Sequence, residues 1–214
     1  MNRIRISGDN IDKLKKQRSF KLAVQLSRLL NVIRANQRQY LRINDDDDPA
    51  NVRDRIELIL YHGAIVYESL KTLLGYSRDL KQLKSWSDNS ITVKKIQSEF
   101  NEQKSFTKKY LEPIRNKILF HYEIEVFDSI LENYALSQNA IFAEAKSERT
   151  IDLAFTLADE LLVNYMIQRI EEPISESEKW GFLEEKLLEI SNDLSSLLYD
   201  FVLELLSGHF YIEE

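Results

Sequence analysis

Residues 50–75 read ANVRDRIELILYHGAIVYESLKTLLG, and the spacing of their apolar side chains decides the fold class. Apolar residues recur at steps of three and four, which is the period of one face of an α-helix. The segment predicts a helix from about residue 50 to 74 that ends at Gly75, because glycine is common just past helix ends. The positions predicted to face the core are Val52, Ile56, Ile59, Gly63, Val66, Leu70 and Leu73.

Gly63 lies in the middle of this predicted helix, where glycine costs roughly 1 kcal/mol relative to alanine. A close approach of a neighbouring helix would justify that cost, so we expect such a contact at Gly63. His62, which stands among apolar neighbours, is expected to be a buried structural histidine.

The helical period extends over nearly the whole chain. Further helices are predicted over residues 11–43, 77–86, 91–111, 114–134, 150–170 and 179–206, and Pro113 is expected to end or kink the helix before it. Loops are expected at 45–48, 87–90, 137–149 and 173–177. No segment alternates with a period of two, so the prediction is an all-α bundle of six or seven helices.

Each long helix has an apolar stripe that predicts its buried face. The core positions predicted for these helices are Leu22, Leu26, Leu29, Leu30, Ile33 and Tyr40 in the first, Ile91, Ile96, Phe100, Phe106 and Tyr110 in 91–111, and Leu183, Leu187, Ile190, Leu194, Leu197, Phe201 and Leu205 in the last.

Composition limits the classes of function. The 214 residues include 5 Gly and 3 Pro, which favours long elements, and no Cys, which excludes disulfides and thiolate chemistry. Absence of cysteine suits a reducing cytoplasm, and the first ten residues lack the apolar segment of a secretory signal. No uncharged apolar run approaches the ~20 residues of a membrane span. We therefore expect a cytoplasmic protein that does not insert into a membrane.

Charge is segregated along the chain although the net charge is −6. Residues 1–44 hold eleven Lys or Arg and two acids, whereas residues 144–214 hold five basic and seventeen acidic residues. The basic first helix is compatible with binding RNA phosphates. It is equally compatible with a solvated helix that pairs with the acidic last helix, within one chain or between two chains.

Motifs for most site chemistries are missing. There is no Gly-rich phosphate loop, no Gly-x-Ser-x-Gly and no pair of histidines at metal-binding spacing, so no metal or cofactor is predicted. The run Asp45–Asp48 reads as a solvated turn. A polar stripe over 117–128 fits either a solvated face or the wall of a cleft or interface, and its members are Lys117, His121, Glu125 and Asp128.

Residues 115–121, RNKILFH, resemble the arginine-x(4–6)-histidine motif of the HEPN superfamily. Asn116 stands where that motif commonly has a polar residue directly after the arginine. The resemblance implies a helical core of four or five helices and, for nucleolytic members, a homodimer with one composite ribonuclease site. Here the catalytic residues would be Arg115, His121 and Asn116, which would bind phosphate, transfer protons and orient the pair.

Three further residues are expected to support this site. Lys117 and Tyr122 flank the motif, although many toxin members carry the tyrosine two residues after the histidine rather than one. Glu68 is the best match, by position alone, for the acidic residue that members often carry on an earlier helix. Arg and His six residues apart lie about 120° apart on a straight helix, so a break near the motif or a second copy must bring them together.

The resemblance thus predicts a metal-independent endoribonuclease of the defence or toxin type, with RNA and an antitoxin or other protein as partners. The alternative is a non-catalytic helical scaffold or interaction protein that binds a nucleotide or a partner. A membrane-surface protein is a weaker third reading, because the net charge is negative. The expected organisation is a HEPN-like core over residues 1–173 and an acidic C-terminal helix over 174–214 that packs on the same domain.

Overall fold

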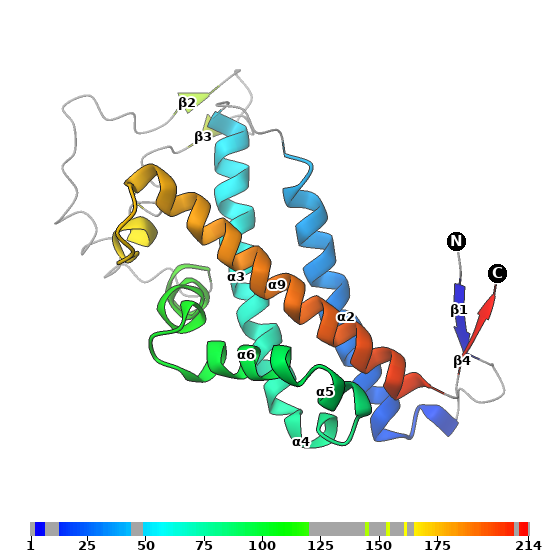
Figure 1. The fold of residues 1–214 in the computed structure, drawn as a ribbon. Coiled ribbons are helices and arrows are strands. Elements are labelled where there is room, and N and C mark those ends of the chain that lie inside the picture. Colours follow the sequence, from blue (N-terminus) through cyan, green and yellow to red (C-terminus); the bar gives the residue numbers. More distant parts are fainter. Residues whose placement is uncertain are drawn as a thin grey trace.

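Three long helices form the body of the molecule in a computed structural model that describes residues 3–6, 13–43, 49–119, 144–145, 153–154, 161, 165–207 and 210–213. They are α2 (Arg18–Tyr40), α3 (Pro49–Gly75) and α9 (Glu176–Leu206). Figure 1 shows α2 and α3 side by side, with α9 crossing them diagonally. Helix α9 starts at a capping box in which Ser175 and Glu178 bond to each other's backbone and side chain, a strong signal for a helix start.

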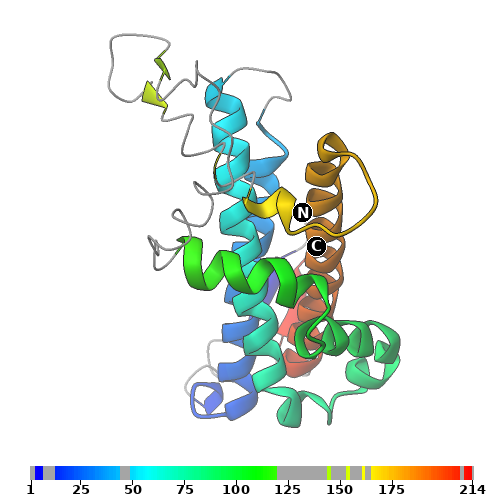
Figure 2. The same cartoon turned by 90° about the vertical axis from the view of Figure 1, so that its left-hand side faces the viewer.

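Shorter helices continue from the end of α3. They are α4 (Ser77–Leu80), α5 (Lys84–Asp88), α6 (Ser90–Asn101), η1 (Thr107–Leu111) and η2 (Ile114–Leu119), and the last two are π-helical. Figure 2 shows this part of the chain folding back so that its green end crosses α3. The described residues thus contain eight helical segments, and the all-α prediction is confirmed.

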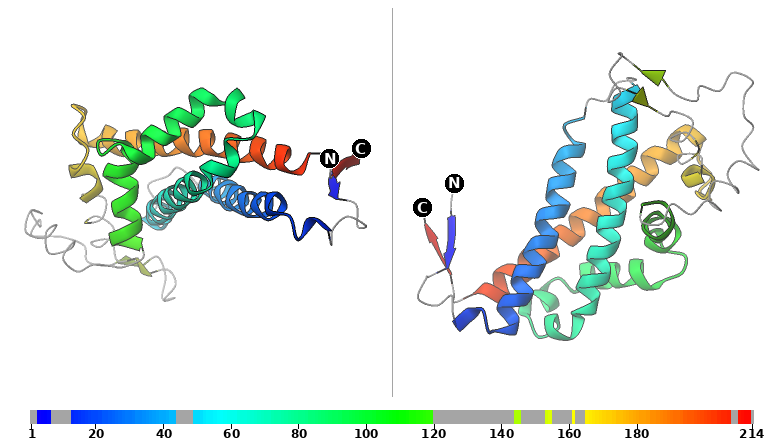
Figure 3. Two further views of the ribbon diagram at one scale, coloured as in Figure 1. Left: turned by 90° about the horizontal axis from the view of Figure 1, so that it is seen from below. Right: turned by 180° about the vertical axis from the view of Figure 1, so that it is seen from behind.

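Two short antiparallel strand pairs accompany the helices. β1 (Arg3–Ile6) pairs with β4 (Phe210–Glu213), and β2 (Glu144–Ala145) pairs with β3 (Leu153–Ala154). The first pair joins the two ends of the chain, as both views of Figure 3 show, and sets Arg3 opposite Glu213. These strands of two to four residues are too short to show an alternating pattern in the sequence, and they leave the all-α assignment unchanged.

A single apolar cluster joins the long helices, α4, α6 and the π-helical turns. Most predicted stripe positions are buried in it, including Leu26, Leu70 and Leu194, each with no exposed surface. Ile91 is an exception: its side chain is 84% exposed, because it lies in the first turn of α6 and points away from the cluster.

Gly63 makes the close helix contact that its position predicts. A Cβ atom placed on Gly63 would lie 3.3 Å from Leu111 Cδ2 and 3.5 Å from Ile114 Cδ1. Leu111 ends η1 and Ile114 begins η2, so the glycine lets both π-helical turns pack tightly on α3.

The prediction for residues 91–111 was wrong in its boundaries. Helix α6 ends at Asn101, residues 102–105 form a turn, and η1 begins at Thr107 after one further helical residue, Phe106. Pro113 does not end the helical structure. Residues on both sides of it form π-helical turns, with hydrogen bonds such as that from Glu112 N–H to Thr107 O. A proline has no N–H and crowds the carbonyl four residues before it, and a widened turn accommodates both effects.

Other boundaries differ from the predictions in smaller ways. The first helix begins at Arg18 rather than near residue 11, after a separate turn, and residues 77–86 contain parts of two helices instead of one. Residues 153–154 form a strand inside the predicted helix 150–170, and only 161 and 165–168 of that range are described as helical. The Asp45–Asp48 turn and most of the predicted helix 114–134 lie outside the described residues.

Candidate functional site

Arg115 meets two of the residues predicted to act with it. Its Nε lies 2.5 Å from Glu68 Oε1, and its Nη1 donates a hydrogen bond to Asn116 Oδ1 at 2.9 Å. Glu68 comes from α3, whereas Arg115 and Asn116 come from η2. The contact with Glu68 is an ion pair without the alignment of a hydrogen bond, so it is mainly electrostatic.

The Arg115 side chain is fixed in orientation but remains partly exposed to solvent. The side chains of Arg115 and Glu68 are 29% and 37% exposed, respectively. A guanidinium fixed from one side by a carboxylate and from another by an amide keeps a defined orientation. Such a group can bind a phosphate or another anion that approaches from solvent.

Three further polar residues continue this cluster along the contact between α3 and the π-helical turns. The Tyr67 hydroxyl donates to Glu112 Oε1 at 2.6 Å, and Lys108 Nζ lies 3.1 Å from the same oxygen. Lys108 also lies 4.8 Å from the centre of the Phe100 ring, within cation–π distance. We call these residues, together with the first three, the α3–η2 polar cluster; its members are Tyr67, Glu68, Lys108, Glu112, Arg115 and Asn116.

Two groups of this cluster have shifted pKa values. Burial and the neighbouring Glu112 carboxylate raise the pKa of the Tyr67 hydroxyl well above its usual value, so it stays a hydrogen-bond donor at neutral pH. Burial alone would raise the pKa of Glu112, but hydrogen bonds from Tyr67 and Lys108 outweigh it and lower that pKa. Glu112 is therefore a carboxylate that holds Tyr67 and Lys108 in place.

A second polar group lies where the three long helices meet. His62 Nε2 is 2.9 Å from Ser191 Oγ, and Gln37 Nε2 donates to the same oxygen at 2.9 Å. His62 is 5% exposed, as expected for a buried structural histidine, and burial lowers its pKa to about 4. Its Nδ1 has no hydrogen-bond partner among the described residues, which agrees with a neutral ring. The adjoining cavity measures about 10 Å³, room for roughly one water molecule and no substrate.

The structure therefore brings Glu68, Arg115 and Asn116 together, and the side chains of the other predicted site residues lie outside the described part of the chain. His121 and Tyr122 lie outside the described residues. The backbone of Lys117 belongs to η2, but its side chain is outside the described part.

Sequence reasoning missed Tyr67, Lys108 and Glu112. The one available signal was the spacing of four residues between Lys108 and Glu112, which favours an ion pair on a helix. Nothing in the sequence connects that pair to Tyr67, which is 45 residues from Glu112.

Comparison of the chain with protein-family models, curated proteins and solved structures finds no significant match. Within the described part of the chain, no helix has both the length and the apolar character needed to cross a membrane.

Proposed function

We propose that this chain is a metal-independent endoribonuclease of the HEPN type, in which Arg115 and His121 act on RNA. The observation that carries the proposal is the contact of Arg115 with Glu68 and Asn116. The motif predicts Arg115 and its neighbour Asn116, and Glu68 is predicted as the acid on an earlier helix. These three residues come together at a partly exposed surface. The π-helical turn that carries Arg115 adds weight, because such turns are frequent at functional sites.

The chemistry follows from the two principal side chains. Histidine titrates near neutral pH, so His121 can take the proton from a ribose 2′-OH or give one to the leaving 5′-oxygen. The attack of the 2′-oxygen forms a 2′,3′-cyclic phosphate and releases a 5′-hydroxyl end. Arg115 would bind the phosphate as its negative charge increases, with Glu68 and Asn116 fixing the guanidinium.

The proposal includes assembly. Two copies of the chain would place two arginines and two histidines around one axis, which removes the difficulty that the two side chains point in different directions on one helix. Lys117 and Tyr122 would flank this composite site. An antitoxin or another protein partner would regulate it.

Variants of the full chain test the proposal on single-stranded RNA. His121→Ala should lower the cleavage rate by about 10²–10⁴-fold, because it removes the proton-transfer group. Arg115→Ala should lower it by about 10²–10³-fold through loss of charge stabilisation. Glu68→Gln should have a smaller effect, about 10–100-fold, because it only loosens the arginine.

Matched controls keep the test specific. Arg169→Ala also removes an arginine, one that bonds Tyr165 at the surface, and it should cleave like the wild type. His62→Ala should lose stability but retain activity in the fraction that stays folded. If all variants cleave equally, or if the wild type does not cleave, the non-catalytic scaffold becomes the better description.

A further inference from the structure

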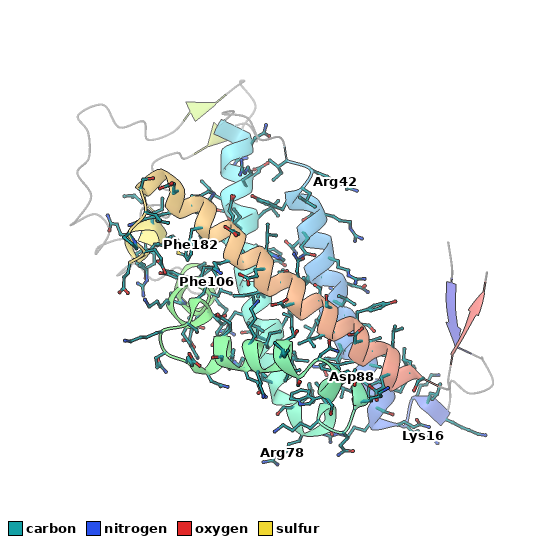
Figure 4. The ribbon with its side chains drawn as sticks, in the orientation of Figure 1. Lys16, Arg42, Arg78, Asp88, Phe106 and Phe182 are labelled. Carbon is teal, nitrogen blue, oxygen red and sulfur yellow. The ribbon has the colours of Figure 1, made fainter. Side chains whose placement is uncertain are left out.

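The solvent side of α2 carries a continuous line of cations. Residues 13–43 contain no Asp or Glu, and nine basic side chains of this segment are exposed. We call five of them, from within α2 and the turn that follows it, the α2 basic ridge: Lys21, Arg28, Arg34, Arg38 and Arg42. At 1.5 Å per residue, the part from Lys21 to Arg38 extends over about 25 Å. Figure 3, in the view from behind, shows no other described helix lying over this side of α2, and Figure 4 shows Arg42 at its upper end.

The acidic residues of α9 do not neutralise the ridge. Helix α2 contacts α9 through buried apolar residues and through Gln37, which bonds Ser191 and Asn192. Glu184 instead pairs with Arg55 of α3.

Four other acids of α9 bind the other side of the molecule. Glu189 and Asp193 both pair with Lys95 of α6, at 2.8 and 2.5 Å. Asp200 accepts a hydrogen bond from Asn89, and Glu204 accepts bonds from the backbone N–H groups at the start of α5. Among the described residues no acid forms an ion pair with a ridge residue, so the ridge fits an anion from outside this bundle.

One exposed aromatic ring adjoins the ridge. The guanidinium of Arg34 lies 5.5 Å from the centre of the Tyr199 ring, and Tyr199 is 42% exposed. Cations that follow a phosphate backbone beside a ring on which a base can stack are the usual elements of a surface for single-stranded nucleic acid.

The side chains between the cations disfavour a membrane surface. A helix that lies on lipid needs a broad apolar face beside its basic residues. Exposed residues interleaved with the ridge are mainly polar, such as Gln25, Asn31 and Gln39. The two large apolar side chains exposed along it, Val24 and Leu41, are 17 residues apart and form no broad apolar face.

We propose that the α2 basic ridge, with Tyr199, binds the phosphate backbone of single-stranded RNA and holds the substrate on the bundle. This inference rests on the proposed ribonuclease function for the identity of the nucleic acid. Its contacts do not involve Arg115 or His121, so the two proposals can fail separately.

Binding to a fluorescein-labelled, 2′-O-methyl single-stranded RNA tests the ridge, because this RNA lacks the 2′-OH needed for cleavage. The full chain should bind it, and affinity should fall steeply between about 50 and 200 mM salt. The triple variant Arg28→Gln, Arg34→Gln and Arg38→Gln should bind at least about tenfold more weakly. Three lost contacts should also reduce the slope of log affinity against log salt by about 2.

The control variant carries the same change in charge away from α2: Arg78→Gln, Lys81→Gln and Lys94→Gln, which are exposed positions of α4, the following turn and α6. It should bind like the wild type. Equal weakening of both triple variants would overturn the proposal, as would binding to phosphatidylserine vesicles without binding to RNA. Cleavage of unmodified RNA, measured in parallel, separates the two proposals. Cleavage without ridge-dependent binding would overturn the proposal for the ridge. Ridge-dependent binding without cleavage would overturn the proposed ribonuclease activity.

Discussion

Helices α2 and α9 lie against each other, yet they use their charges in opposite ways. Three acids of α9 are paired within the bundle: Glu184 with Arg55, and Glu189 and Asp193 with Lys95. The cations of the α2 basic ridge face solvent, and Arg34 contacts only the ring of Tyr199 among the interactions described. The difference agrees with a structural role for the paired acids of α9 and with our proposal that the α2 basic ridge binds RNA.

The largest expected effect on stability comes from a substitution on the buried apolar face of α9. Phe201 has no exposed surface and stacks on Trp86 at 5.8 Å between ring centres. Phe201→Ala should lower the free energy of unfolding by about 3–5 kcal/mol, because it leaves a cavity. Urea denaturation measures this, and Tyr199→Ala on the exposed side of the same helix serves as control, with a loss below about 1 kcal/mol. Similar losses for the two variants would mean that α9 is not packed as described.

A second effect concerns pH at the junction of α3 and α9. Folding lowers the pKa of His62 from 6.5 to about 4, so between these values the unfolded chain binds a proton that the folded chain does not. Stability should therefore be unaffected by His62 above pH 6.5 and fall as the pH drops, by about 2 kcal/mol between about pH 7 and about pH 5.

The variant His62→Leu should lose this dependence, because it cannot take up a proton. Glu112 and Glu189 have lowered pKa values, so their contributions are lost as the pH falls from the ordinary carboxyl pKa of 4.5 toward the lowered values. Unfolding curves compared above pH 5 thus isolate the histidine, and an unchanged pH dependence in His62→Leu would contradict a neutral, buried ring.

Removing Lys95 tests the claim that the acids of α9 are structural. Lys95→Met should lower the free energy of unfolding by about 0.5–1 kcal/mol, since the pairs with Glu189 and Asp193 are partly exposed and screened by water. Lys94→Met, at the exposed neighbouring position, should change it by less than about 0.5 kcal/mol. The difference in unfolding free energy between the two variants should shrink at high salt. Equal losses for the two variants at low salt would contradict a structural role for the acids of α9.

The smallest effect is expected within the α2 basic ridge. Arg38 lies four residues from Arg34, and like charges at this spacing destabilise a helix by about 0.2–0.5 kcal/mol, but a cation in the last turn of α2 also interacts favourably with the helix dipole. The two effects oppose each other, so Arg38→Gln should change stability by less than about 0.5 kcal/mol in thermal unfolding at low salt. A clear loss of stability would show that the ridge has a structural role after all.

Much of the fold was predictable, because apolar stripes determine buried faces. Ile56, Leu70 and Leu187 follow a helical period and are buried in the structure, and Gly63 signals its close contact. The course of the chain around Pro113 was not predictable from propensity, since tertiary packing against Gly63 supports a π-helical turn there. The pairing of residues 3–6 with 210–213 joins the two ends of the chain, and no local pattern encodes such a distant partner.

The candidate site was predictable only where a motif exists. Arg115 and Asn116 come from the resemblance to the HEPN motif, and Glu68 was chosen by position and does contact Arg115. Tyr67 and Glu112 bond to each other across two elements, and this contact depends on how η1 packs on α3 rather than on any spacing in the sequence.

One measurement tests the central proposal most directly: incubation of the purified full chain with single-stranded RNA in EDTA, followed by analysis of the RNA ends. Cleavage by Arg115 and His121 needs no metal, so products with 2′,3′-cyclic phosphate and 5′-hydroxyl ends should form, and Arg115→Ala should form them about 10²–10³-fold more slowly. Intact RNA under these conditions, or 5′-phosphate ends, or equal cleavage by Arg115→Ala, would contradict the proposed ribonuclease.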